Sequence, residues 1–317
     1  MKTELTQAKF RAALGRAGQF FSMVALGATI LICSSASAQN LFVSGRDSGG
    51  GEIFKFTWDG GRSIFASGLY KPWDLAFDNA GNLFVVDYVI LDGGDAVGNA
   101  AIFKITPNGA LSIFAFRLSY SSSLAADKAG NLLVADYDSG IIYQYKPSGS
   151  RATFASGLYH PVGMVLDSAG NLYVADNNIG NLHQGSIYKY KPDGSRATIA
   201  VLNPGDRPSD LALDSLGNLY MADLGGNIYK YALSEVLRRG QGRTTFGSVP
   251  NSAQSLAFDS AGNLFVVDAG DVTAKGAGTP NAIYKFTQQG ARSAFASGEG
   301  PGESFGCLAF QPIACCQ

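Results

Sequence analysis

The stretch that decides the fold is Leu75-Ala-Phe-Asp-Asn-Ala-Gly-Asn-Leu-Phe-Val-Val-Asp87, which returns almost unchanged as residues Leu256–Asp268. Close variants of it occupy Leu124–Asp136, Met164–Asp176 and Leu211–Asp223. Each copy is followed by a second phrase of the type Ile-Tyr-Lys-Tyr, a Pro-Asp-Gly or similar turn, and Arg-Ala-Thr-Phe-Ala. Self-similarity at intervals of roughly 40–50 residues is typical of repeat architectures such as propellers.

Each repeat unit is expected to form four antiparallel strands, which we call a to d. In strand c, for example Ile187-Tyr-Lys-Tyr190, apolar and polar residues alternate as they do in a half-buried strand. Strand b, for example Asn82–Asp87, is more continuously apolar, so we expect it to be buried between neighbouring blades. A glycine such as Gly81 in the a–b turn supplies the positive φ that this turn needs.

The two ends of the repeat array predict how the ring closes. The array opens with a strand b alone, Asn40–Val43, and ends with a leftover strand a, Leu308–Gln311. Pairing of these two segments completes a sixth blade and removes the free edges of the sheet. The sequence therefore predicts an all-β, six-bladed β-propeller over residues 39–311, followed by a short tail at 312–317, and we expect a monomer.

These phrases resemble the NHL repeat, in which a Pro-x-Gly element precedes Gly-Asn, an apolar-aromatic pair, Val, Ala and Asp. The copy from His160-Pro-Val-Gly163 to Gly170-Asn-Leu-Tyr-Val-Ala-Asp176 is nearest to that pattern. The resemblance covers essentially all of 39–311 and implies a propeller related to SMP-30/gluconolactonase-like enzymes, to virginiamycin B lyases and to non-enzymatic NHL modules. Fold alone does not choose among these activities.

The N-terminal segment has the features of an export signal. Basic residues precede an apolar stretch at Phe20–Ile32, and Ala36-Ser37-Ala38 has the form of a signal-peptidase site. We therefore expect residues 1–38 to be a signal peptide cleaved near Ala38, and the mature protein to be secreted or periplasmic. The apolar stretch is too short for a spanning helix, so no membrane span is expected after cleavage.

Charge and cysteine content exclude some functions. The chain has no basic patch, so we expect no nucleic-acid partner. Cys307, Cys315 and Cys316 remain after removal of the signal peptide, without the CxxC spacing of a zinc site. In an oxidising compartment Cys307 could pair with either of the other two; the alternative is a tail whose thiols stay free.

The irregular segments of the repeat predict which face carries function. In a propeller of this type the b–c and d–a loops emerge on one face. The b–c loops are longest at 88–100, 177–186 and 269–281, whereas the a–b turns are uniform in length. Variable loops on a rigid scaffold are where binding sites usually form. We therefore place any ligand site on this face, around the central channel.

The resemblance to SMP-30-like lactonases implies a divalent cation such as Ca²⁺, held by oxygen ligands at the channel. The matching positions carry no carboxylate: Trp73, Ser122, Val162, Ser209, Gln254 and Gly306. One residue further along the chain stand Asp74, Ser123, Gly163, Asp210, Ser255 and Cys307. Asp74 and Asp210 belong to opposite blades, which makes them the candidate catalytic and metal-binding residues. The alternative is that both are solvated or capping residues at strand starts.

The resemblance to virginiamycin B lyases implies a histidine base, for which His160, in a d–a loop, is the candidate. The aspartates that end each strand b occupy one repeat position, so they are expected to be structural and to accept hydrogen bonds from the following loop. They are Asp87, Asp136, Asp176, Asp223 and Asp268.

The leading hypothesis is a ligand- or protein-binding scaffold, because each catalytic template lacks its defining residues. Exposed aromatic side chains in d–a loops suit recognition of a protein, a glycan or a small molecule. The candidate ligand-binding residues are Tyr70, Trp73, Tyr120, Tyr159, Asn177 and Asn178. A lactone hydrolase and a virginiamycin B lyase-like enzyme remain the alternatives.

Overall fold

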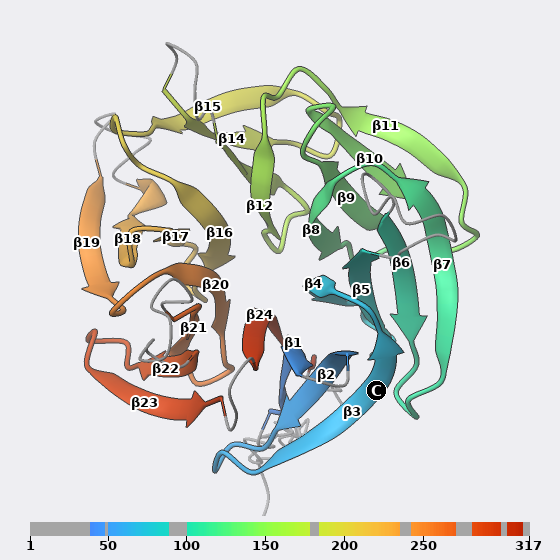
Figure 1. The fold of residues 1–317 in the computed structure, drawn as a ribbon. Coiled ribbons are helices and arrows are strands. Elements are labelled where there is room, and N and C mark those ends of the chain that lie inside the picture. The colour runs from blue at the N-terminus through green and yellow to red at the C-terminus, as the bar shows by residue number, and fades with distance from the viewer. Residues whose placement is uncertain are drawn as a thin grey trace, which may run out of the picture. The chain divides into compact units, whose positions relative to one another are not determined.

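The computed structural model describes residues 39–47, 50–88, 100–177, 184–234, 242–270, 281–298 and 303–312. Strands in these ranges form six antiparallel sheets of four strands each, and the sheets surround a central channel (Figure 1). The prediction of an all-β, six-bladed propeller is confirmed. No helix in the described ranges is long and apolar enough to cross a membrane. The predicted signal peptide and residues 313–317 lie outside these ranges.

The strands of each blade run from the channel outward. Blade one contains β24 (Ser304–Phe310), β1 (Leu41–Asp47), β2 (Gly50–Phe56) and β3 (Arg62–Leu69); blade two contains β4 (Pro72–Phe77), β5 (Leu83–Tyr88), β6 (Ala100–Ile105) and β7 (Leu111–Leu118). Blade three contains β8 (Ser121–Ala126), β9 (Leu132–Asp136), β10 (Ile141–Tyr145) and β11 (Arg151–Ala155); blade four contains β12 (Pro161–Leu166), β13 (Leu172–Asp176), β14 (Ser186–Tyr190) and β15 (Arg196–Val201). Blade five contains β16 (Pro208–Leu213), β17 (Leu219–Asp223), β18 (Asn227–Tyr231) and β19 (Arg243–Ser248); blade six contains β20 (Ala253–Phe258), β21 (Leu264–Asp268), β22 (Ala282–Phe286) and β23 (Arg292–Ser297).

Blade one closes the ring as predicted. β24 pairs antiparallel with β1, with Val43 opposite Leu308 and Leu41 opposite Phe310. The strand begins at Ser304, four residues before the predicted start, and this extension places Phe305 in the core. The Phe305 ring lies 6.1 Å from the rings of both Phe54 and Phe56 in edge-on contacts. The C-terminal strand is therefore both a hydrogen-bonding partner and a packing element of the first blade.

The apolar core lies between neighbouring blades, where the continuous apolar pattern of strand b predicts it. Every residue of β9, β13, β17 and β21 is buried. Between blades one and two, for example, Phe42 packs edge-on against Phe65 at 4.8 Å and against Phe77 at 5.0 Å. Burial on both faces explains why strand b lacks the polar alternation of strand c.

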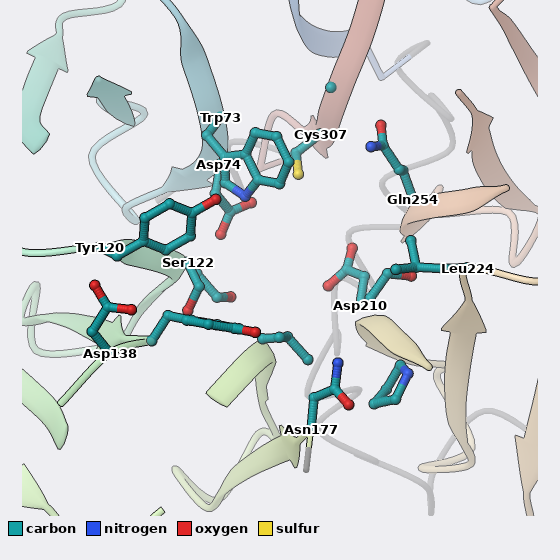
Figure 2. A pocket seen from close by; sticks show the side chains of 16 residues that line it. Trp73, Asp74, Tyr120, Ser122, Asp138, Asn177, Asp210, Leu224, Gln254 and Cys307 are labelled. Atoms are coloured by element: carbon teal, nitrogen blue, oxygen red, sulfur yellow. The ribbon is translucent and has the colours of Figure 1, made fainter. Parts of the chain in front are cut away.

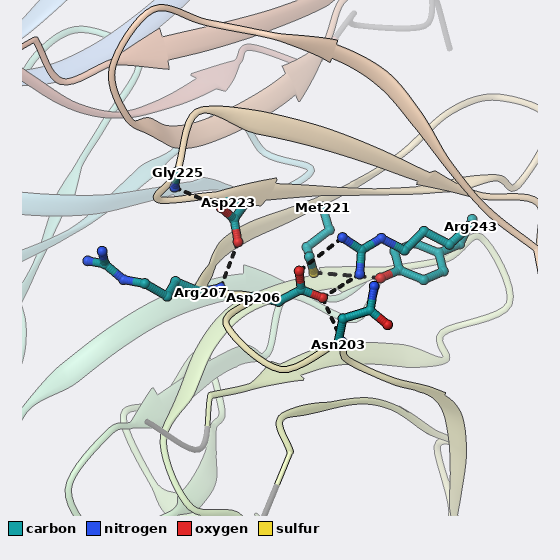
Figure 3. A network of polar contacts seen from close by, with 8 residues as sticks. Asn203, Asp206, Arg207, Met221, Asp223, Gly225 and Arg243 are labelled. Carbon is teal, nitrogen blue, oxygen red and sulfur yellow. Dashed lines mark hydrogen bonds and ion pairs between the residues drawn. The ribbon is translucent and has the colours of Figure 1, made fainter. Parts of the chain in front are cut away.

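The aspartates that end strand b accept backbone hydrogen bonds from the following loop, as predicted and as Ser139 gives to Asp136, and several also accept them from the preceding d–a loop. Asp87 accepts hydrogen bonds from the backbone N–H groups of Tyr70 and Lys71, which precede strand a of the same blade. Asp223 accepts one from Arg207 in the preceding d–a loop, at 2.6 Å, and one from Gly225 in the following loop, at 2.7 Å (Figure 3). The d–a loop passes beside the end of strand b, so the carboxylate can bind both loops. These hydrogen bonds hold the d–a loops against the ends of strand b.

A second network holds the d–a loop of blade five. Asp206 accepts a hydrogen bond from the backbone N–H of Asn203, at 2.8 Å, and pairs with both terminal nitrogens of Arg243 on β19 (Figure 3). A bidentate arginine–carboxylate pair of this kind is geometrically specific. Asp206 thereby ties the loop that leads into the inner strand of blade five to the outer strand of the same blade.

Candidate functional site

A β-bulge in the inner strands aims side chains into the channel. In β12, Pro161 lies opposite Asp176 and Gly163 lies opposite Ala175, so Val162 has no partner on strand b. The same shift leaves Ser122, Ser209 and Gln254 unpaired, and β4 and β24 are irregular at the equivalent positions. Bulges commonly re-aim a side chain beside a binding site. The residues at the six bulge positions line one cavity: Trp73, Ser122, Val162, Ser209, Gln254 and Gly306.

The residue after each bulge position belongs to a second set, which we call the channel ring. It consists of Asp74, Ser123, Gly163, Asp210, Ser255 and Cys307, one from each inner strand.

Channel-ring side chains accept hydrogen bonds from the neighbouring blade. Asp74 Oδ2 accepts from the N–H of Leu124, at 2.6 Å, and Asp210 Oδ2 accepts from the N–H of Leu256, at 2.9 Å. Ser255 Oγ accepts from the N–H of Leu308, at 3.2 Å, and donates to Asp210. The same atoms that face the channel thus join one blade to the next. Asp74 and Asp210 thus cap backbone N–H groups, which was one expectation. They also line a common cavity, as the other expectation requires.

Gly163 is the one channel-ring residue without a side chain, and the structure requires this. A Cβ atom at this position would lie 2.7 Å from Cα of Asp210. We expect Gly163→Ala to lower the free energy of unfolding by about 1–3 kcal/mol, because blade four would have to move away from blade five. Urea denaturation measures this loss. Gly298→Ala is the matched control, since its nearest neighbour would be an ordinary 3.7 Å away and its stability should be unchanged. Equal stability of the two variants would contradict the close approach.

The cavity at the mouth of the channel has a volume of about 350 Å³, within the size range of small-molecule sites. Asp74 and Asp210 lie on opposite sides of it, with Trp73 and Tyr120 on the Asp74 side and Leu224 and Gln254 on the Asp210 side (Figure 2). Asp138 adds a third carboxylate. The lining contains no lysine, arginine or histidine within the described ranges. The cavity is therefore acidic.

Burial controls the protonation of the two channel-ring carboxyls. Loss of contact with water raises the pKa of Asp74 to about 6, against the opposing effect of the Leu124 and Leu75 amides. Burial, followed by repulsion from Asp74, raises the pKa of Asp210 to about 7. Burial and the two nearby aspartates raise the pKa of the Cys307 thiol well above its usual value. Asp74 and Asp210 therefore gain or lose a proton near neutral pH, whereas the Cys307 thiol stays protonated.

Five aromatic rings form a continuous arc on one side of the cavity, which we call the aromatic arc. It comprises Trp73, Tyr88, Tyr120, Tyr137 and His160. Successive ring centroids are 6.4, 5.2, 5.4 and 4.3 Å apart. Trp73, Tyr120 and Tyr137 line the cavity itself. The arc spans blades two to four, so the two sides of the site differ in chemistry.

Only some of the predicted binding residues line the cavity. Trp73, Tyr120 and Asn177 line the cavity, but Trp73 lies within β4 and not in a d–a loop as predicted, because the strand begins at Pro72. Tyr70 and Tyr159 are 44% and 46% exposed and are not among the lining residues. Asn178 lies outside the described residues.

His160 does not line the cavity. Its ring stacks on Tyr137 at 4.3 Å, and its Nδ1 lies 3.1 Å from the carbonyl oxygen of Tyr137. The candidate histidine thus supports an aromatic wall and is separated from the cavity by that wall.

Sequence reasoning missed four lining residues: Tyr137, Asp138, Pro208 and Leu224. Tyr137 and Leu224 directly follow the aspartate that ends strand b, as Asn177 does. The position after this aspartate was therefore a usable signal for pocket residues.

Metal-binding groups are sparse in this site. The described ranges contain no group of three or more histidine, cysteine, aspartate or glutamate residues that could hold a metal ion. Asp74 and Asp210 offer two carboxylates, both already engaged by backbone amides, whereas Ca²⁺ takes about 6–8 oxygen ligands. These residues do not fit a divalent-ion centre of the lactonase kind. Cys307 forms no disulfide with another described residue, and its two candidate partners, Cys315 and Cys316, lie outside the described ranges, so their pairing stays a prediction.

Comparison with known proteins agrees with the propeller fold. A family model described as strictosidine synthase-like, N-terminal, matches residues 195–231, which cover β15 to β18. No curated protein matches. A solved structure of a nidogen/laminin complex matches with a TM-score of 0.68 and 18% identity, over 87% of this chain and 100% of that chain.

Two solved enzymes have the same fold, with similarly low sequence identity. A gluconolactonase from Xanthomonas campestris matches with a TM-score of 0.59 and 18% identity, over 74% of this chain and 78% of that chain. A PQQ-bound aldose sugar dehydrogenase from Streptomyces coelicolor matches with a TM-score of 0.59 and 14% identity, over 78% and 90%. The resemblance to NHL and SMP-30-like propellers is thus confirmed as a likeness of fold, and these identities carry no activity to this chain.

Proposed function

We propose that this protein is a binding protein that takes a small molecule in the channel-mouth cavity, on the face formed by the b–c and d–a loops. The observation that carries the proposal is the convergence of all six bulge positions on one cavity of about 350 Å³. A built cavity of this size, with aromatic walls and a few polar groups, is the usual form of a small-molecule site. Export through the predicted signal peptide would place this binding activity outside the cytoplasm.

The lactone hydrolase is the second candidate, and the raised pKa values of Asp74 and Asp210 favour it. A carboxyl group that titrates near neutral pH is suited to general acid–base work. Metal analysis of the purified protein and a lactone-hydrolysis screen separate the two functions. A bound divalent ion that is lost in Asp74→Asn, together with turnover, would replace the binding function by the hydrolase.

A fragment screen by ligand-observed NMR tests the binding function. We expect Val162→Trp to fill the cavity and weaken fragment binding at least tenfold. Val201→Trp is the matched control, because Val201 lies on the outer strand β15 and is 59% exposed. Gln254→Trp, which fills the same cavity from blade six, should repeat the loss if the first variant is destabilised. Undiminished binding in folded Val162→Trp and Gln254→Trp proteins would place the ligand elsewhere.

A further inference from the structure

We infer that the ligand of the cavity is an N-methylated, quaternary ammonium ion that also carries a polar oxygen group. This inference rests on the proposed binding function and specifies its ligand class. Three features of the cavity carry it: its net negative charge, its aromatic wall and the way its carboxylates are already engaged.

The charge of the cavity selects cations. Asp74, Asp138 and Asp210 line it, and no basic side chain does so within the described ranges. Above neutral pH, where Asp74 and Asp210 are ionised, an anionic ligand would meet repulsion from all three carboxylates in a partly enclosed site. A cation would instead be attracted, and it would also relieve the repulsion between Asp74 and Asp210.

The aromatic wall selects an organic cation. Trp73, Tyr120 and Tyr137 present their rings on one side of the cavity, and the remainder of the aromatic arc supports them from behind. The faces of such rings attract cations, and several rings around a cationic centre are the usual recognition device for quaternary ammonium groups. A small, strongly hydrated metal ion gains little from such a wall.

The Asp210 carboxylate is poorly suited to bind a primary ammonium group. Asp210 Oδ1 accepts a hydrogen bond from Leu211 N–H, and its Oδ2 accepts from Leu256 N–H and from Ser255 Oγ. A carboxylate has about four lone-pair sites, and a primary ammonium brings three donors that need partners. A quaternary ammonium donates no hydrogen bond, so it can use the charge of Asp210 without competing for these partners.

Asn177 accounts for the second part of the ligand. Its side chain is 5% exposed and its amide points into the cavity from the side of blade four (Figure 2). No hydrogen bond joins this amide to another group in the described part of the chain. Because the amide faces the cavity, a ligand bound there can reach it. An oxygen on the ligand, such as a hydroxyl, would satisfy it.

Isothermal titration calorimetry at pH 8 with choline tests the inference. The comparison ligands are 3,3-dimethylbutan-1-ol, its neutral isostere, and ethanolamine, its primary-amine counterpart. We expect choline to bind at least tenfold more tightly than either. Trp73→Leu should weaken choline binding at least fivefold, whereas Trp58→Leu, at a 72% exposed turn, should not. Asp74→Asn/Asp210→Asn should abolish the preference for choline over the isostere, because each side chain keeps its size and one acceptor oxygen but loses its charge.

Each contrary result has a defined meaning. Equal binding of choline and its neutral isostere overturns the cation requirement, and equal binding of ethanolamine overturns the N-methylated class. If choline does not bind while fragments in the NMR screen do, the ligand class is wrong and the binding function stands. If neither choline nor fragments bind, both proposals fail. Affinity should also rise between pH 5 and pH 8, because Asp74 and Asp210 must ionise. Cys307 and Tyr88 also lie near them, and burial raises the pKa of each, so both stay neutral over this range.

Discussion

Removal of residues 303–317 is expected to abolish cooperative folding of the whole propeller. The deletion takes away β24, which is the inner strand of blade one and the pairing partner of β1 from Leu41 to Arg46. It also removes the buried Phe305 ring from the cluster around Phe54 and Phe56. A typical domain has only about 5–15 kcal/mol of stability, which is less than the loss of a whole inner strand. Circular dichroism melting should show no sharp transition.

A graded version of this experiment separates packing from closure. A chain that ends after Pro312 keeps all of β24 and should melt like the full protein. Phe305→Ala keeps the strand but leaves a cavity, so its free energy of unfolding should fall by about 3–5 kcal/mol. If the chain without 303–317 melted sharply and within a few degrees of the full protein, blade one would not need its inner strand and the closure argument would be wrong.

The channel-ring carboxyls should make the protein less stable as pH rises through neutrality. The pKa of Asp210 is raised from 3.8 to about 7 in the folded state, so between these values the folded protein binds a proton more tightly than the unfolded chain does. Stability from this group is therefore fully present below about pH 4 and is lost as pH rises toward 7 and above. Replacement by Asn removes the cost of a buried charge, which exceeds the loss of one of the two oxygens that accept backbone hydrogen bonds. We expect Asp210→Asn to be more stable than the native protein at pH 8, by on the order of 2–4 kcal/mol.

Urea denaturation at pH 5 and pH 8 measures this effect. The difference between the native protein and Asp210→Asn should shrink at pH 5, where Asp210 is already protonated. Asp193→Asn is the control, because Asp193 lies in an exposed turn and its pKa is lowered by hydrogen bonds from Ser195. An Asp210→Asn variant that is less stable than the native protein at pH 8 would show that its neighbours hold the carboxylate ionised, which is the opposite of a raised pKa.

The repeat made the fold predictable from sequence, down to the pairing of the chain ends. Val43 lies opposite Leu308 because each segment supplies the strand that the other lacks. The repeat also located the channel ring, since Asp74 and Asp210 stand at one fixed position before the Leu-Ala-Phe phrase. Position in a repeat fixes where a side chain lies along its strand and toward which face it points.

Contacts between repeats were harder to predict. The loop bound by Asp87 depends on how near the preceding loop passes, and neighbouring positions in sequence do not reveal that distance. His160 could be placed on the correct face, but its stacking on Tyr137 arises between two different blades. The aromatic arc was invisible for the same reason. Its members occupy three kinds of repeat position and meet only when blades two to four are assembled.

The hydrogen bonds between channel-ring residues and the next blade have a consequence for how such a site changes over evolutionary time. Asp74 and Asp210 each face the ligand cavity and also hold a backbone N–H of the adjacent blade. A substitution that alters ligand preference at these two positions must therefore supply another acceptor, or the seam between two blades weakens. Trp73 and Gln254 line the same cavity from bulge positions, which have no partner on strand b. Ligand specificity can therefore change through substitutions at the bulge positions. Substitutions at Asp74 and Asp210 are limited to side chains that still accept the backbone hydrogen bond of the adjacent blade.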